Sequence, residues 1–171
     1  MERTFVPDPS PWVPISDPRT LKVLGKFVEE LGECVEAAIQ RVHRSTDDHT
    51  DALQSEIADV LCNIELVDEH LCLNWPRFHG KAETGSAMIH LIASLGGCIA
   101  ATARCIIQGV DECEPSTGTP NREWLFEAIT HVRRYCVAAI SNYDLDPDAI
   151  DARMTFKRGH LTRWHQMEIV A

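Results

Sequence analysis

The sequence is short of positive charge. Its 171 residues include 16 Lys and Arg against 26 Asp and Glu, which gives a formal net charge of −10. A surface that binds a nucleic-acid backbone or an anionic membrane needs the opposite balance, so we expect neither partner. A small anionic ligand stays compatible with this charge if a metal ion supplies positive charge at its site.

Paired cysteine motifs are also missing. The seven cysteines include no Cys-x-x-Cys pair, and their spacing fits neither a zinc site nor a thiol nucleophile. Several of them lie among apolar neighbours at helical spacing, which is typical of small buried side chains in a reducing compartment. The Glu-x-x-His motif of helical di-iron proteins is absent as well, and this excludes that class.

No targeting segment and no clean membrane span are visible. Residues 1–17 are rich in proline and polar residues rather than apolar ones. The longest apolar stretch, residues 88–107, is interrupted by polar and charged side chains, and it predicts a buried helix rather than a membrane-spanning one. We therefore expect a cytoplasmic protein without a membrane partner.

Apolar residues recur at helical spacing along most of the chain, and no alternating pattern indicates strands. The sequence therefore predicts an all-α fold, a bundle of about four to five helices. Breaks rich in Pro, Gly and polar residues separate the helices. We expect helices at about 18–43, 50–73, 83–110, 121–142 and 147–159.

The chain length suits one domain with a real core. We expect residues 18–165 to form this domain, between an extended Pro-rich arm at 1–17 and a tail at 166–171. Asp17 is expected to cap the first helix, and Asn121 the fourth.

Two acidic doublets on the first two predicted helices are the most informative feature of the chain. They pair Glu30 with Glu33 and Glu56 with Asp59. Residues three apart share one helix face, so two antiparallel helices would bring four carboxylates into a small volume. Such charges repel strongly unless a cation lies between them, and Mg²⁺ suits carboxylate oxygens together with phosphates.

An internal repeat relates the two halves of the chain. Residues 31–37 align with 95–101, and residues 56–60 align with 128–132. Apolar positions are kept in this alignment, whereas all four acids are lost together. The repeat predicts a duplicated helical hairpin in which one copy keeps the acidic site and the other serves as scaffold. The replaced acids become Ser94, Gly97, Ala128 and His131.

The acidic motif resembles that of the MazG-like all-α nucleoside triphosphate pyrophosphohydrolases. Lys26 lies one turn before the motif, and Asn63 lies four residues after its end. Residues 103–109 and 120–125 also look like those of phage and bacterial relatives, so the resemblance covers most of residues 19–165. The motif reads Glu29-Glu30-Leu31-Gly32-Glu33, then 22 residues, then Glu56-Ile57-Ala58-Asp59.

The resemblance implies a Mg²⁺-dependent hydrolase, for which Mn²⁺ can substitute. Its substrate would be a nucleoside triphosphate, cleaved between the α and β phosphates to a monophosphate and pyrophosphate. A deoxyguanosine substrate (dGTP to dGMP) is expected by analogy alone. The likeness to viral members also implies a protein that a virus could encode for use in the host cytoplasm, where it would control a nucleotide pool.

The resemblance assigns roles by position. One carboxylate, Glu33 or Glu56, would accept a proton from water as the catalytic base. Family members usually carry a basic residue and an Asn near the C-terminus, and Arg153 and Lys157 stand at those positions here. The implied metal ligands are Glu30, Glu33, Glu56 and Asp59. The implied substrate contacts are Lys26, Asn63, Arg153 and Lys157.

Two alternatives stay open at the level of the sequence. Either doublet alone is more typical of a solvated helix face than of a metal site. A catalytically silent helical module that binds nucleotide or another protein is the second alternative, because the second repeat has already lost its acids. Family members also assemble into homodimers or higher homo-oligomers, and we expect the same here.

Overall fold

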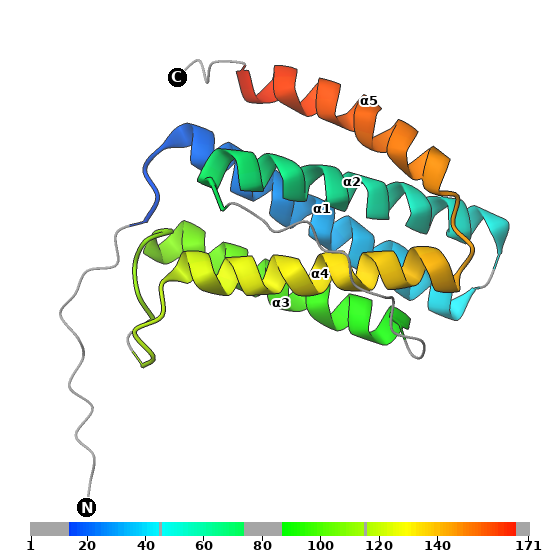
Figure 1. The fold of residues 1–171 in the computed structure, drawn as a ribbon, viewed down its shortest axis with the longest axis horizontal. Coiled ribbons are helices and arrows are strands. Elements are labelled where there is room, and N and C mark those ends of the chain that lie inside the picture. Colours follow the sequence, from blue (N-terminus) through cyan, green and yellow to red (C-terminus); the bar gives the residue numbers. More distant parts are fainter. Residues whose placement is uncertain (1–13, 45, 74–86, 115, 167–171) are drawn as a thin grey trace, which may run out of the picture.

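The computed structural model describes residues 14–44, 46–73, 87–114 and 116–166. Over these residues it contains five α-helices and no strand, which confirms the all-α bundle (Figure 1). The predicted arm at 1–17 is described only from residue 14, and the predicted break at 74–80 lies outside the described residues. The helices are α1 (Pro18–His43), α2 (Asp47–Leu71), α3 (Ala87–Gln108), α4 (Asn121–Asn142) and α5 (Pro147–Gln166).

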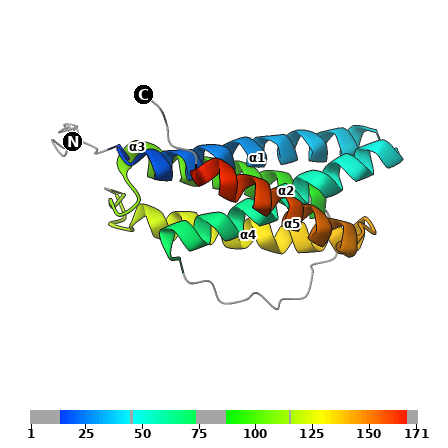
Figure 2. The ribbon, with the colours of Figure 1, turned by 90° about the horizontal axis from the view of Figure 1, so that it is seen from above.

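The helices form three layers. Helices α1 and α2 make one antiparallel hairpin, and α3 and α4 make a second hairpin that packs against the first (Figure 1). Helix α5 lies along α2 on the side away from the second hairpin (Figure 1), and in the view from above it crosses in front of the first hairpin (Figure 2). The last helix therefore covers the first hairpin, and no described helix lies on the outer face of the second.

The start of the first helix follows the prediction. Asp17 is the N-cap of α1, and its Oδ2 accepts a hydrogen bond from the backbone N–H of Thr20 at 2.8 Å. Pro18 fills the first turn, where its missing N–H costs nothing.

Three other boundaries differ from the prediction. Helix α2 begins at Asp47 rather than near residue 50, because acidic residues in the first turn complement the positive end of a helix. Pro120, not Asn121, is the N-cap of α4, since Asn121 is buried and donates a side-chain N–H to the carbonyl of Gly109 at 2.9 Å. Helix α5 continues to Gln166 instead of ending near residue 159, because Leu161 is buried against α2.

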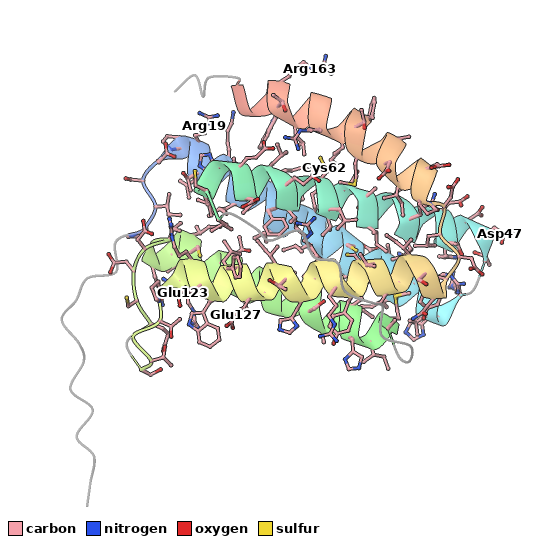
Figure 3. All side chains as sticks on the ribbon, viewed as in Figure 1. Arg19, Asp47, Cys62, Glu123, Glu127 and Arg163 are labelled. Atoms are coloured by element: carbon pink, nitrogen blue, oxygen red, sulfur yellow. The ribbon has the colours of Figure 1, made fainter. Side chains whose placement is uncertain are left out.

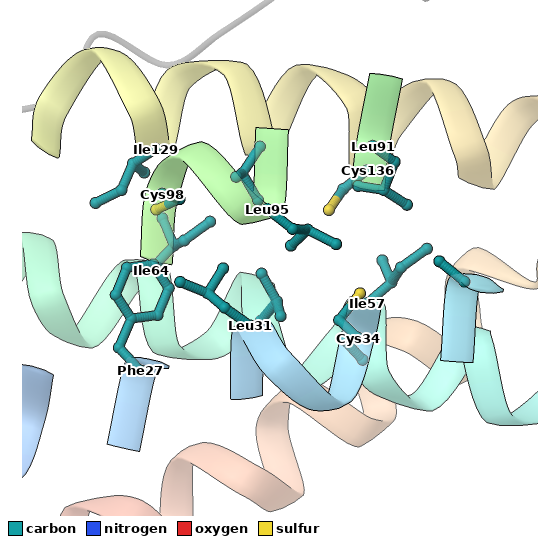
Figure 4. Close-up of a cluster of buried hydrophobic side chains, with 14 of the residues drawn as sticks. Phe27, Leu31, Cys34, Ile57, Ile64, Leu91, Leu95, Cys98, Ile129 and Cys136 are labelled. Carbon is teal, nitrogen blue, oxygen red and sulfur yellow. The ribbon is translucent and has the colours of Figure 1, made fainter. Parts of the chain in front are cut away.

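The core lies where the two hairpins meet, and side chains from α1 to α4 interdigitate there (Figure 4). Positions that the repeat aligns are buried alike, as a duplicated hairpin predicts. Leu31 and Leu95 are both fully buried, and so are Cys34 and Cys98. The same holds between α2 and α4 for Ile57 with Ile129 and for Val60 with Val132.

Helix α3 is less buried than the sequence predicts. By length and composition alone, it is the one helix among the described residues that is apolar enough to cross a membrane. Its inner side packs on α1 and α4, but only 28% of its most apolar 18-residue stretch is buried. Ile89 on the outer side is 67% exposed. None of the other four described helices thus covers this apolar face of α3.

Equivalent leucines of the two hairpins should contribute equally to stability. Leu31→Ala and Leu95→Ala should each lower the free energy of unfolding by about 2–5 kcal/mol, since both leave a cavity in the shared core. Leu21→Ala is the control, because this side chain is 36% exposed; its cost should stay below about 1 kcal/mol. Urea unfolding followed by circular dichroism measures all three. A near-zero effect of Leu95→Ala would contradict a common core.

Candidate metal and phosphate site

The first side of the site comes from α1, whose acidic and basic residues lie one turn apart. Glu30 is fully buried, although it is charged, while Glu33 one turn later is exposed. The Nζ of Lys26 lies 2.7 Å from Oε1 of Glu30 and 3.0 Å from Oε1 of Glu29. Lys26 therefore compensates part of the charge that α1 carries into the bundle.

The second side comes from α2. Glu56 is partly buried, and Asp59 one turn later is almost fully buried. Asn63 lies on the same face and donates a side-chain N–H to the backbone carbonyl of Asp59 at 2.9 Å. This donor is thus held by its own helix, and a contact of Asn63 with a substrate stays a prediction.

The third side is α5, which brings two cations over the carboxylates. The guanidinium of Arg153 donates from Nε and Nη2 to the two oxygens of Asp59, at 2.8 and 2.7 Å. The ammonium of Lys157 lies 2.7 Å from Oδ2 of Asp59 and 2.9 Å from Oε1 of Glu30. Lys157 thereby joins the two doublets, which come from different helices.

Three of the four predicted acids converge into one group that could hold a metal ion. One carboxylate oxygen each from Glu30, Glu33 and Glu56 lies within 4.8 Å of the others. Oε2 of Glu30 and Oε2 of Glu56 are buried without a hydrogen-bond partner among the described residues. Buried anionic oxygens are rarely left unsatisfied, so these two oxygens are candidate ligands for a cation.

Glu33 and Glu56, the two acids of this group that are not fully buried, both have a raised pKa. Burial raises the pKa of Glu56 to about 7, and the charge of Asp59 is the next cause. Burial also raises the pKa of Glu33 above its ordinary value, with the charge of Glu30 as the next cause. A carboxyl group with a pKa near 7 can exchange protons at neutral pH, as a general base requires.

The two lysines stay charged at neutral pH. Burial alone lowers the pKa of Lys26, but its contacts with Glu30 and Glu29 outweigh burial and raise the pKa. The same balance raises the pKa of Lys157, through its contacts with Asp59 and Glu30. Lys26, Lys157 and Arg153 therefore offset much, but not all, of the charge of the neighbouring carboxylates.

The donor set fits Mg²⁺ or Mn²⁺. All its atoms are carboxylate oxygens, which such hard ions prefer. Glu30, Glu33 and Glu56 would hold the ion between α1 and α2, since one oxygen of each lies within 4.8 Å of the others. The two unpartnered buried oxygens support the same fit.

The sequence prediction missed how firmly α5 is fixed to α2. Arg158 donates to Oε2 of Glu65 at 2.9 Å and also to Glu69. Cys62, labelled in Figure 3, packs with Leu161 in a small apolar cluster between the two helices. Arg153, Lys157 and Arg158 are four and five positions apart in the sequence. This spacing could have indicated a basic face of α5 that packs on the acidic α2.

The second hairpin carries a groove where the first carries its acids. This groove has a volume of about 470 Å³ and lies on α3 and α4. Glu127, which lines it, projects from α4 on the side away from α5 (Figure 3). The lining residues include all six repeat counterparts of the α1 and α2 site residues: His90, Ser94, Gly97, Ala128, His131 and Tyr135.

Comparison of the chain with protein-family models, with curated proteins and with solved structures finds no match. Membership of the MazG-like family therefore stays a prediction that rests on the acidic motif.

The raised pKa of Glu56 should make its substitution pH-dependent in metal-free protein. The pKa of Glu56 is about 7 in the folded protein and about 4.5 in the unfolded chain. Protonation of Glu56 therefore stabilises the fold fully below pH 4.5, and this stabilisation is lost as the pH rises through about 7. Gln cannot ionise, so Glu56→Gln does not lose this stabilisation. Relative to wild type, the free energy of unfolding of the variant should rise by about 1 kcal/mol between pH 5 and pH 8, after allowance for the partial exposure of Glu56.

Urea unfolding in EDTA at several pH values measures this difference. Asp51→Asn, an exposed acid on the same helix, is the control and should show no such trend. A difference between Glu56→Gln and wild type that stays constant from pH 5 to pH 8 would mean that Glu56 ionises normally.

Proposed function

We propose that the protein hydrolyses a nucleoside triphosphate between its α and β phosphates, with a divalent metal ion held by Glu30, Glu33 and Glu56. The observation that carries the proposal is the convergence of these acids around two unpartnered buried oxygens, directly beside three cations. Such a place suits an ion and a polyphosphate together, because each neutralises the charge of the other.

The side chains divide the chemistry between them. When bound, the metal ion supplies a water of lowered pKa and neutralises phosphate oxygens. Glu56, with a pKa of about 7, is suited to accept a proton from water, and Glu33 is the alternative base. Lys26, Lys157 and Arg153 offer N–H donors for phosphate oxygens at the edge of the carboxylate group.

A silent binding module is the second candidate. It would use the same cations and metal but would release no product, and the second hairpin, which has lost its acids, keeps this alternative open. Nucleotide would stabilise such a module against heat without any release of pyrophosphate.

Pyrophosphate release decides between the two. We expect release from at least one member of a panel of ribo- and deoxyribonucleoside triphosphates with Mg²⁺ or Mn²⁺, and none in EDTA. The panel also tests the predicted preference for dGTP. Glu33→Gln and Glu56→Gln should lower kcat by roughly 10²-fold or more, because each removes a ligand and a candidate base.

Glu36→Gln is the matched control, since Glu36 is exposed on α1 and accepts a hydrogen bond from the side-chain N–H of Gln40 at 3.0 Å. Its activity should equal that of wild type. Thermal stabilisation by nucleotide without pyrophosphate release from the folded protein would favour the silent module.

We further propose that two copies associate through the outer face of α3 and α4. In a chain of net charge −10, two copies repel each other over most surfaces. Helix α3 carries no Asp or Glu and exposes Ile89 and Ile107, so a second copy could bury apolar side chains there with little repulsion from this helix.

A charge placed on α3 should break this association. Light scattering should give the mass of a dimer for wild type, and Ile89→Glu should shift it to that of a monomer. Val42→Glu on α1 is the control, since Val42 is also an exposed large apolar residue, at 55%. A monomeric wild type at micromolar concentration would contradict the proposal.

A further inference from the structure

Asp59 is the acid of the motif that the protein itself neutralises. Both of its oxygens are taken by α5, Oδ1 by Nε of Arg153 and Oδ2 by Nη2 of Arg153 and the ammonium of Lys157. The side chain of Asp59 is only 2% exposed, so water does little to screen these contacts. A two-pronged guanidinium contact of this kind is among the strongest that a carboxylate makes.

The other acids are placed differently. Oε2 of Glu30 and Oε2 of Glu56 have no hydrogen-bond partner among the described residues. Together with Glu33 they form the converging group, and Asp59 does not belong to it. The acids of the motif thus divide into one that is fully paired and three that present oxygens to a common point.

We propose that Asp59 is the anchor that fastens α5 across the site, and that the metal ion is held by the other three carboxylates alone. The second half of this inference rests on the proposed metal site. If Asp59 bound the ion, the divalent ion would lie directly beside Arg153 and Lys157, two cations of the same sign.

The weak apolar contact of α5 explains why an ionic anchor matters. Only Ile150 and Leu161 are buried apolar residues within this helix. Its other contacts include the ion pairs of Arg158 with Glu65 and Glu69 in the C-terminal half of α2, and the partly buried Met154 and Trp164 beside Leu161. Without Asp59, Arg153 and Lys157 lose their shared partner, and α5 keeps only this limited apolar packing and the pairs of Arg158 to hold it in place.

Two isosteric variants separate the roles of anchor and ligand. Mn²⁺ affinity is measured by electron paramagnetic resonance, and hydrogen exchange of α5 is measured in EDTA, both on the full chain. Glu56→Gln should weaken Mn²⁺ binding at least 10-fold and leave the exchange of α5 unchanged. Asp59→Asn should change the Mn²⁺ Kd less than 3-fold and speed the exchange of α5 at least 10-fold.

Lys157→Met tests the anchor from the side of α5, so the inference stays testable if Asp59→Asn does not fold. It should also speed the exchange of α5, without weakening Mn²⁺ binding more than 3-fold. Asp51→Asn is the control for both readouts and should change neither, because Asp51 is an exposed acid of α2 outside the site.

The inference is overturned if Asp59→Asn loses Mn²⁺ as strongly as Glu56→Gln while α5 keeps its protection. A wild type that binds no Mn²⁺ would overturn the proposed function and the three-carboxylate ligand set together. The exchange of α5 in EDTA does not depend on the metal, and unchanged exchange in both Asp59→Asn and Lys157→Met would overturn the anchor by itself.

Discussion

The pairing of carboxylates with cations inside the bundle is the constraint on which the rest of the structure depends. Glu30 and Asp59 are buried in the first hairpin, where an uncompensated charge would be very costly. Lys157 compensates both acids at once, and it can do so only if α5 returns along α2 after the second hairpin is complete. Helix α5, the third layer of the fold, thus lies where the charge of Glu30 and Asp59 has to be balanced.

The cations do not compensate all the charge of the buried carboxylates. Arg153 and Lys157 contact Asp59 on one side of the carboxylate group, while Oε2 of Glu30 and Oε2 of Glu56 have no hydrogen-bond partner among the described residues. A protein that only needed stability would replace such acids with apolar residues, which often stabilise buried positions better. Their retention in one hairpin beside their loss in the other is the physical argument for a function at this place.

Much of this arrangement could be predicted from the sequence, because it depends on local spacing. The period of the apolar residues gave five helices, and the three-residue spacing of the doublets put Glu33 and Glu56 in one group. What could not be predicted depends on contacts between distant segments. Examples are the burial of Asn121 in place of capping, the continuation of α5 to Leu161, and the capture of Asp59 by α5.

The two hairpins bury the same register positions with and without acids, so the chain contains an internal comparison of its own. Leu31 and Leu95 occupy matching places, but among the described residues the group of converging carboxylates lies beside the first, whereas the groove beside the second has Glu127 as its single acid. The first hairpin has to tolerate repulsion between its carboxylates, whereas the second can be optimised for packing. Substitutions that improve folding can therefore accumulate in α3 and α4 at little cost to the acidic site.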